Sequence, residues 1–455
     1  MSRAPVGKPR AVAPARACAY RVLRRVFEQG AYAEKALLGE AAELDARDRA
    51  LAMRLAYGAV QRRGTTDHLI GQLAGRAPEQ LDPPLLAALR LALYELLYLG
   101  GAPDYAVIDD GVELAKAPGR SGHGLVNAVL RRAAREGPER LLGGLTDATP
   151  EQAAIKHSHP LWIAELWWDA LGPEQARALM ARDNEPAELA LRANMLRTDA
   201  DGLAAQIAVP SHRDPRIPEA LVLDGPLDIH ASPLWAEGAY TAQSRAAMLV
   251  ARVLAPEPGE RVLDLCAAPG GKSTHMAALM EARGELVAVE RNARRAHKLQ
   301  RTANRLGAQN IRVEIADAAE PREDGPFDRA LVDPPCSGLG TLQARPDRRW
   351  RAELASIAEM RQSQSRILGV GADALRPGGV LVYSTCTVSP TENERLIADF
   401  LDSRPDFSLD DLAAEWPEFA LAGPAGRAAA RPGMLLTLPH RDDTAGFFIA
   451  RLRRS

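Results

Sequence analysis

Cysteine, aromatic residues and long apolar runs are all scarce in this chain of 455 residues. The four cysteines show neither paired zinc-ligand spacing nor the density of a disulfide-stabilised secreted domain, which excludes both classes. No apolar run approaches the length of a membrane span, and the opening segment MSRAPVGKPRAVAPAR lacks the apolar core of a secretory signal. We therefore expect a cytoplasmic protein with reduced thiols, no bound metal and no membrane partner.

A large net charge is also missing, because the formal net charge is -2 at pH 7. The balance hides an uneven distribution: arginine is frequent early in the chain, and the segment RNARRAHKLQRTANR, residues 291–305, contains no acidic residue. Such segments suit phosphate groups, although a solvated helix face has the same composition. The length predicts about two to four domains. Residues 1–14, rich in Pro, Arg and Ala, are expected to form a mobile basic arm.

The stretch RVLDLCAAPGGKS, from Arg261 to Ser273, reads as a strand, a glycine-rich turn and a helix. Its apolar run stops before Pro269, Gly270 and Gly271, which cannot continue a strand. A loop of this kind lets the backbone approach a ligand, and the helix after it presents unpaired N–H groups. The loop matches neither G-x-G-x-x-G nor the phosphate-binding P-loop, so neither a dinucleotide nor ATP is the expected ligand.

Acidic residues end three later predicted strands. Glu290 follows LVAV, Asp317 follows IRVEIA, and Asp333 follows DRALV. An acidic residue at the carboxyl end of a parallel strand can bind ribose hydroxyls, whereas the alternative for each is to cap a surface helix. Because the glycine-rich loop precedes them, the three acids together favour a ligand that contains adenosine.

Two cysteines also stand at predicted strand ends, Cys336 within DPPCSG and Cys386 within YSTCT. In a doubly wound parallel sheet, both loops lie at the same edge as the glycine-rich loop. A single cysteine is usually a buried small apolar residue, but two thiols in this crevice suit methylation of carbon 5 of cytosine. A thiolate that adds to carbon 6 makes carbon 5 nucleophilic, and a second residue can assist product release. Asp333 is placed to hydrogen-bond the ring near N3.

The front of the chain is almost entirely helical in pattern. Apolar residues recur at three- and four-residue spacing from Ala15 to Ala134, with breaks at Gly, Pro and Asp, which predicts a bundle of about five to seven helices. The segments Arg16–Arg25, Arg47–Arg54 and Gly124–Arg132 resemble the NusB-type RNA-binding helical domain. Helical periodicity by itself implies a packed bundle, and the resemblance adds contact with RNA.

A small α/β domain is expected between residues 151 and 233. It begins with a tryptophan-rich helix, in which Trp162, Trp167 and Trp168 either stack on bases or pack in the core. The segment ELALRANMLRTDADG then reads as strand, turn and helix, and it resembles the LRVN-type strand that precedes the catalytic domain of RNA methyltransferases. Residues 240–243, YTAQ, are expected at the head of the next helix.

The motifs DLCAAPGGKS, DPPCSGLG, YSTCT with PTENE, and GFFIARL occur in this order, and the chain resembles the bacterial ribosomal RNA cytosine-5 methyltransferase family RsmB, also called Sun. The resemblance implies a multidomain α + α/β fold: a NusB-like helical domain at 15–140, the small α/β domain at 151–233, and a Rossmann-like methyltransferase domain at 234–455. It also implies S-adenosylmethionine as cofactor and small-subunit ribosomal RNA as partner. We expect a monomer.

The resemblance assigns roles residue by residue. It makes Cys386 the nucleophile and Cys336 the helper in product release; because DNA cytosine methyltransferases use the Pro-Cys thiol instead, exchanged roles are the alternative. Glu290 falls at the ribose, Asp317 near the adenine, and Asp333 at the active site beside the cofactor. The remaining cofactor positions form the glycine-rich loop: Cys266, Ala267, Ala268, Pro269, Gly270, Gly271 and Lys272. The alternative for Lys272 is that it only braces the loop.

Three departures from the family pattern leave both thiols unchanged. Gln243-Ser244-Arg245 replaces the start of Gln-Asp-x-x-Ser, Ala445 replaces the Asp before Gly-Phe-Phe, and Pro334 replaces the usual small residue in Asp-x-Pro-Cys. Asp442 or Asp443 can compensate for the second change. The predicted function is methylation of carbon 5 of a cytosine in 16S ribosomal RNA. Its alternatives are methylation of another RNA such as tRNA, a non-catalytic NusB-like RNA-binding factor, and methylation of a protein or small molecule.

Overall fold

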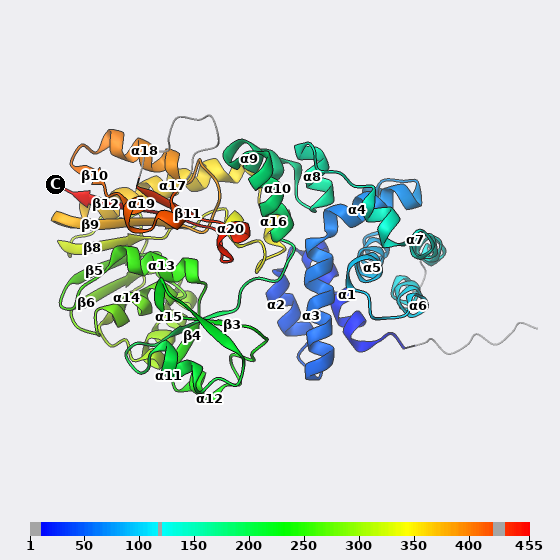
Figure 1. The fold of residues 1–455 in the computed structure, drawn as a ribbon, viewed down its shortest axis with the longest axis horizontal. Helices are drawn as coiled ribbons and strands as arrows, with labels where there is room; N and C mark the ends of the chain where they lie inside the picture. The colour runs from blue at the N-terminus through cyan, green and yellow to red at the C-terminus, as the bar shows by residue number, and fades with distance from the viewer. Residues whose placement is uncertain (1–10, 117–120, 422–432) are drawn as a thin grey trace, which may run out of the picture. The chain divides into compact units, whose positions relative to one another are not determined.

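The computed structural model describes residues 11–116, 121–421 and 433–455, and the chain divides into two compact units (Figure 1). The helical unit comprises residues 1–169, 173–185 and 342–351. The sheet unit comprises residues 170–172, 186–341 and 352–455. The predicted mobile basic arm, residues 1–14, lies outside the described residues except for its last four positions.

One buried helix organises the helical unit. α5 (Pro83–Tyr94) begins with a proline, which suits the first helical turn, and every residue from Pro84 to Leu93 is buried. The predicted helical bundle is confirmed, with α1 to α7 in the described part of residues 14–143. Its other helices are α1 (Pro14–Gln29), α2 (Ala33–Glu40), α3 (Ala46–Gln61), α4 (Arg63–Ala74), α6 (Asp104–Ala115) and α7 (His123–Gly143), followed by α8 (Pro150–Lys156), α9 (Leu161–Leu171) and α10 (Pro173–Arg182).

The tryptophan-rich helix is α9. Trp167 is fully buried, and its ring lies 5.5 Å from the ring of His159. The Trp168 ring packs under the guanidinium of Arg177, at 5.4 Å from its centroid. Of the two roles considered for these tryptophans, Trp167 therefore takes core packing.

A ten-residue segment from the second half of the chain, Leu342–Arg351, belongs to the helical unit. The fully buried Arg349 donates a hydrogen bond from Nη2 to the carbonyl oxygen of Asp183 at 3.0 Å. Trp350 Nε1 donates to the carbonyl oxygen of Val60 at 2.7 Å. No local sequence pattern predicts that this segment joins the helical unit, because these two hydrogen bonds connect residues that are 166 and 290 positions apart in the chain. The segment ends in the short helix α16 (Arg348–Arg351).

The sheet unit is built on an eight-stranded mixed sheet with the order β10-β12-β9-β8-β5-β6-β7, and β11 pairs with β12. The parallel strands are β5 (Arg261–Leu265), β6 (Glu285–Val289), β7 (Ile311–Glu314), β8 (Phe327–Val332) and β9 (Leu375–Thr385); β10 (Phe407–Leu409), β11 (Met434–Thr437) and β12 (Phe447–Arg454) pair antiparallel. The strand order reverses between β5 and β8. Ligand crevices of such sheets lie at this point, beyond the carboxyl ends of the strands.

Helices cover both faces of this sheet, which confirms the predicted doubly wound class (Figure 1). Because the central strands are covered on both sides, β5 is apolar except at Arg261 and Asp264 and is almost wholly buried. One face carries α13 (Arg245–Leu254), α14 (Gly271–Leu279) and α15 (Ala293–Leu306); the other carries α17 (Leu354–Asp373) and α18 (Glu394–Ser403). The unit also has the short helices α12 (Pro233–Ala236), α19 (Leu412–Glu415) and α20 (Pro439–Asp442).

Residues 151–169 and 173–185 of the predicted small α/β region belong to the helical unit. The later part of that region, together with residues 240–242, forms a second, antiparallel sheet with the order β2-β3-β1-β4. It consists of β1 (Ala190–Ala193), β2 (Ser211–Asp214), β3 (Ile217–Leu223) and β4 (Tyr240–Ala242), with α11 (Ala200–Ala204) after β1. The prediction that residues 240–243 begin a helix is wrong. Residues 240–242 pair with β1, the Tyr240 side chain is fully buried, and the helix begins only at Arg245.

Candidate active site

The glycine-rich loop connects β5 to α14 at the carboxyl edge of the sheet. The backbone N–H of Ala267 donates to the carbonyl of Val289 at 2.9 Å, and that of Gly270 closes a turn onto the carbonyl of Ala267 at 2.9 Å. Gly270 has a φ of 101°, a conformation that glycine adopts without a steric cost. The first amide groups of α14 have no partner within the helix, so they are available to a ligand.

A buried arginine from the small sheet holds the beginning of α14. Arg192 on β1 donates to the carbonyl of Gly271, to Gln243 Oε1 at 2.5 Å and to Thr274 Oγ1 at 2.9 Å. Burial lowers the pKa of Arg192 to about 9. The sequence signal for this residue was a lone charge in the otherwise apolar strand ALRA, all of which is buried.

Two of the three predicted acids differ sharply in environment. Glu290 follows β6 directly and is buried; its carboxylate accepts from the backbone N–H of Asn292 at 2.8 Å and lies 3.2 Å from Arg295 Nη1. Asp317 is exposed, and its Oδ1 accepts from the backbone N–H of Ala319 at 2.9 Å. β7 ends three residues before Asp317, so this acid lies in a loop instead of at the predicted strand end.

The third acid, Asp333, follows β8 directly and pairs with the lysine of the glycine-rich loop. Lys272 Nζ lies 2.6 Å from Asp333 Oδ2, and Ser384 Oγ donates to the other carboxylate oxygen at 3.2 Å. The ammonium also lies over the Phe447 ring, 4.9 Å from its centroid. Burial opposes the charge of Lys272, but Asp333 outweighs burial and raises its pKa, so the ammonium remains protonated.

The two predicted catalytic thiols meet at the ends of the neighbouring strands β8 and β9. Cys336 Sγ and Cys386 Sγ lie 3.4 Å apart. Cys336 is only 6% exposed, whereas Cys386 is half-buried. The hydrogen bond with Cys386, followed by burial, raises the pKa of Cys336 well above its usual range. Cys386 is close enough to the Lys272 ammonium for the two to interact electrostatically.

The thiol of the glycine-rich loop, Cys266, differs from this pair. Burial, reinforced by the nearby Asp333, Asp264 and Glu290 carboxylates, raises the pKa of Cys266 to about 12. Its sulfur therefore stays a neutral thiol at neutral pH, which suits contact with a ligand and not nucleophilic attack.

Two of the departures from the family pattern have local explanations. Ser244 Oγ accepts from the backbone N–H of Ala247 at 3.3 Å, so serine caps α13 in the way aspartate would. Arg245 Nε donates to Glu188 Oε2 at 2.7 Å, and Arg245 Nη2 donates to the carbonyl of Asp443 at 2.6 Å. This arginine thus ties the loop before Gly446-Phe447-Phe448 to the region of the small sheet.

Two buried side chains that the sequence analysis did not single out contact the thiol loops. Glu392 accepts from the backbone N–H of Ser337 at 2.8 Å, and Asn393 Nδ2 donates to the carbonyl of Thr387 at 2.9 Å. Both residues belong to the PTENE motif, which was the available signal. Their buried positions depend on the fold and could not be read from the motif.

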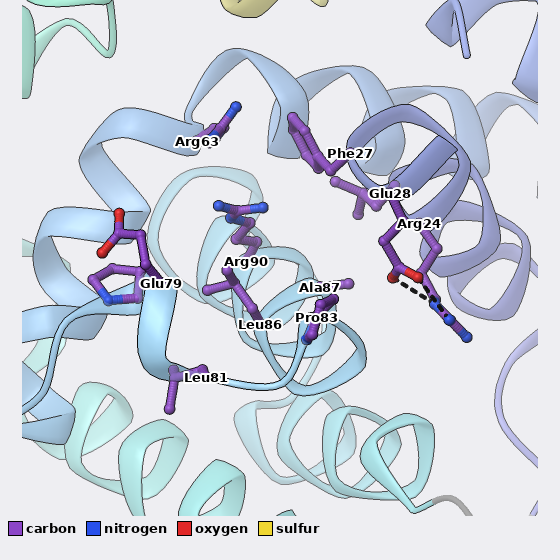
Figure 2. A pocket seen from close by; sticks show the side chains of 12 residues that line it. Arg24, Phe27, Glu28, Arg63, Glu79, Leu81, Pro83, Leu86, Ala87 and Arg90 are labelled. Carbon is purple, nitrogen blue, oxygen red and sulfur yellow. Dashed lines mark hydrogen bonds and ion pairs between the residues drawn. The ribbon is translucent and has the colours of Figure 1, made fainter. Parts of the chain in front are cut away.

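The helical unit contains a hollow of about 420 Å³ between α1, α4 and α5 that holds none of the predicted site residues (Figure 2). Its arginines are occupied. Arg24 donates to both carboxylate oxygens of Glu28 at 2.7 and 2.8 Å, and Arg90 donates to both of Asp67 at 2.6 and 2.7 Å. Arg63 Nε lies 3.5 Å from Asp67 as well. The hollow therefore offers little surplus positive charge to an anion.

In the described part of the chain, no group of three or more His, Cys, Asp or Glu side chains is arranged to hold a metal ion. Among the same residues, no helix is long and apolar enough to cross a membrane. The chemistry available at the crevice is that of two adjacent thiols, an ammonium–carboxylate pair and a loop open to a ligand.

Three family models match the chain in succession. Residues 13–135 match the NusB family, residues 159–230 match the ferredoxin-like domain of RsmF/B-like methyltransferases, and residues 251–453 match the model described as 16S rRNA methyltransferase RsmB/F. The order of these matches agrees with the predicted sequence of helical, small and Rossmann-like domains.

Relatives match over almost the whole chain. A Synechocystis protein named "Probable ribosomal RNA small subunit methyltransferase B" is 37% identical, covering 97% of this chain and 99% of its own. A Bacillus subtilis protein of the same name is 35% identical, covering 90% and 92%. The crystal structure titled PH0851 superimposes with a TM-score of 0.77 at 26% identity, covering 98% of this chain and 100% of that one.

Proposed function

Because the chain belongs to the RsmB/F family of 16S rRNA methyltransferases, we propose that it methylates carbon 5 of a cytosine in 16S ribosomal RNA with S-adenosylmethionine as methyl donor. The observation that carries the proposal is the separation of 3.4 Å between the sulfurs of Cys336 and Cys386 beside the glycine-rich loop. Transfer to nitrogen or oxygen needs no covalent thiol, whereas carbon 5 of cytosine becomes nucleophilic only after addition at carbon 6.

Cys386 is the nucleophile in this proposal. It is the more exposed sulfur, and the Lys272 ammonium nearby favours its thiolate. The thiolate forms a bond to carbon 6, and the electron pair of the ring double bond moves toward carbon 5. The Asp333 carboxylate, held by Lys272 and Ser384, hydrogen-bonds the polar edge of the cytosine and orients the ring.

Cys336 takes part in release. The hydrogen bond with Cys386 and burial, together with the negative charge of the Cys386 thiolate, keep the Cys336 pKa high and the Cys336 thiol protonated. Formation of the adduct removes that charge, so the Cys336 pKa falls and its proton can pass to solvent. Once carbon 5 carries the transferred methyl group, the Cys336 thiolate accepts the carbon-5 proton, the double bond between carbons 5 and 6 re-forms, and the bond between carbon 6 and Cys386 breaks.

The residues of the loop fit a nucleoside cofactor. The buried Glu290 carboxylate can accept hydrogen bonds from ribose hydroxyls, and the open amide groups of α14 can receive a carboxylate group. The bound cofactor would supply an electrophilic methyl group on a sulfonium. Asp317 is exposed in the loop after β7, and its proposed role is a hydrogen bond to the edge of the adenine.

The RNA backbone is proposed to lie along α15. Arg294, Lys298 and Arg301 fall on one stripe of this helix by their spacing of four and three residues, and Arg291 directly precedes its cap. All four are exposed, and within the described ranges none forms an ion pair with a carboxylate. The stripe starts next to Glu290, so phosphates bound there lie beside the crevice.

The experiment incubates wild type, Cys386→Ala and Cys336→Ala with tritiated S-adenosylmethionine and either deproteinised small-subunit ribosomal RNA or tRNA, followed by denaturing gels. We expect free labelled ribosomal RNA from wild type, no label with Cys386→Ala, and a slowly migrating protein–RNA band with Cys336→Ala. A covalent band with Cys386→Ala alone would exchange the two roles. If only tRNA becomes labelled, the substrate is tRNA and not ribosomal RNA. If none of the three proteins labels either RNA, the proposal is overturned.

A further inference from the structure

The loop between β9 and α18 carries two adjacent buried polar side chains, Glu392 and Asn393, whose hydrogen bonds reach both thiol loops. We infer that they are positioning residues that fix the two sulfurs against each other, with Glu392 governing the Cys336 loop and Asn393 the Cys386 loop. The division of labour between the two cysteines rests on the proposed function; the positioning itself does not.

Glu392 holds the residues on both sides of Cys336. Its carboxylate accepts from the backbone N–H of Ser337 at 2.8 Å and from Ser337 Oγ at 2.5 Å. It also accepts from Gln364 Nε2 at 3.1 Å, and the same amide group donates to the carbonyl of Pro335 at 2.9 Å. The residues on both sides of Cys336, Pro335 and Ser337, are therefore held in place by hydrogen bonds.

Asn393 holds the residues on both sides of Cys386 in the same way. Its Oδ1 accepts from Thr385 Oγ1 at 2.6 Å, and its Nδ2 donates to the carbonyl of Thr387 at 2.9 Å. One side-chain amide thus holds the side chain of the residue before, and the backbone carbonyl of the residue after, the nucleophile proposed above.

The two loops are also joined directly. Ser337 Oγ and Thr387 Oγ1 lie 2.6 Å apart, and the backbone N–H of Gly340 donates to the carbonyl of Cys386 at 3.0 Å. A Cβ at Gly340 would lie 2.0 Å from the carbonyl oxygen of Gly446, so only glycine allows this approach. Since consecutive residues anchor both loops, a shift in either one changes the distance between the sulfurs.

The chemistry at Glu392 requires a carboxylate. Ser337 and Gln364 present three donors to it, and a carboxylate accepts through both oxygens whereas a carboxamide accepts through one. In the described residues no cation forms an ion pair with this buried group, so its partners are the loop donors. Glu392→Gln keeps the shape and places an N–H₂ group against donors, which makes it a sharp test.

The kinetic test measures formation and release of the covalent RNA adduct separately by rapid quench at saturating substrates. The variants are Glu392→Gln, Asn393→Asp and, as a matched control two residues on, Glu394→Gln. We expect Glu392→Gln to lengthen the adduct lifetime about tenfold with formation nearly unchanged, and Asn393→Asp to slow formation about tenfold with release nearly unchanged. KM values for both substrates should stay close to those of wild type, and melting temperatures should fall by only about a few degrees, because each of these two variants leaves buried donors or acceptors unpaired.

A second measurement needs no RNA. The oxidant diamide, which takes one hydrogen atom from each thiol, converts Cys336 and Cys386 to a disulfide, and mass spectrometry follows the linked peptide. We expect slower linkage in Glu392→Gln and Asn393→Asp than in wild type and Glu394→Gln. If wild type forms no adduct with any RNA but the linkage rates follow this order, the proposed function fails and the positioning stands. Unchanged linkage rates, or equal effects of both variants on formation and release, overturn the inference.

Discussion

The loops that carry Cys336 and Cys386 follow neighbouring parallel strands, yet they create different environments for their sulfurs. Cys336 is almost completely buried and has a raised pKa, while Cys386 is half-buried and lies near a lysine that stays charged. Equivalent positions at one sheet edge therefore produce one buried thiol with a raised pKa and one thiol that is more exposed. The difference comes from their neighbours: the hydrogen bond with Cys386 and burial act on Cys336, whereas Cys386 lies near the Lys272 ammonium.

The strongest test of this asymmetry removes each sulfur in turn. Cys386→Ala should lower single-turnover methyl transfer by about 10⁴-fold or more, because no adduct can form. The double variant Cys336→Ala/Cys386→Ala should lose no more than Cys386→Ala alone, since release is irrelevant without an adduct. Rapid-quench transfer of tritiated methyl groups measures both. Additive losses would contradict sequential roles for the two thiols.

The next test removes the charge that distinguishes the two sulfurs. Lys272→Met should slow adduct formation by about 10- to 100-fold, because the Cys386 thiolate and Asp333 both lose the ammonium. Lys272→Arg keeps a positive charge and serves as the control, with a smaller loss. The comparison uses rates of adduct formation at saturating cofactor. Equal rates in wild type and Lys272→Met would show that Lys272 does not contribute to adduct formation.

The pH dependence of release sharpens the assignment of Cys336. A base must be ionised to accept the carbon-5 proton, and burial keeps the Cys336 pKa raised even after the adduct has removed the Cys386 charge, so release should accelerate with rising pH by up to about tenfold per unit below that pKa. The wild-type adduct, formed first at low pH, is transferred to a series of higher pH values and its decay is followed on gels. In Cys336→Ala the decay should lose this dependence; an unchanged slope would point to another base.

The smallest effect is expected from cations that leave both thiols untouched. The triple variant Arg294→Gln/Lys298→Gln/Arg301→Gln should raise the KM for RNA about fivefold. The slope of log KM against log salt concentration should fall by about two, since three phosphate contacts are lost. The ratio of adduct formation to release should not change. The control Arg294→Lys/Arg301→Lys keeps the charges and should retain the wild-type KM.

Basic side chains in the two units also differ in whether they form ion pairs with carboxylates. In the helical unit, Arg24 and Arg90 each donate to both oxygens of a carboxylate, so a high arginine content there does not create an open anion site at the hollow. On α15 the exposed stripe forms no such pairs within the described residues. Composition indicated basic segments in both places, and only side-chain pairing separates them.

Local signals predicted the elements around the glycine-rich loop well. The apolar run of β5, the turn residues Pro269 to Gly271 and the acids after β6 and β8 depend on neighbours in sequence, so strand, loop and helix were identified from the chain alone. Predictions failed where pairing between distant segments decides. Residues 240–242 form an edge strand instead of a helix start, and β7 ends before Asp317.

By itself, the sequence determined the order of the domains, the parallel strands with their glycine-rich loop, and the position of two cysteines just after strand ends, because periodicity, turn chemistry and motif spacing are local properties. Tertiary structure alone decided that Lys272 pairs with Asp333, that the two sulfurs lie 3.4 Å apart, and that Glu392 and Asn393 anchor their loops. It also decided that residues 342–351 join the helical unit. These features depend on contacts between residues brought together by folding, and spacing along the chain carries no direct record of them.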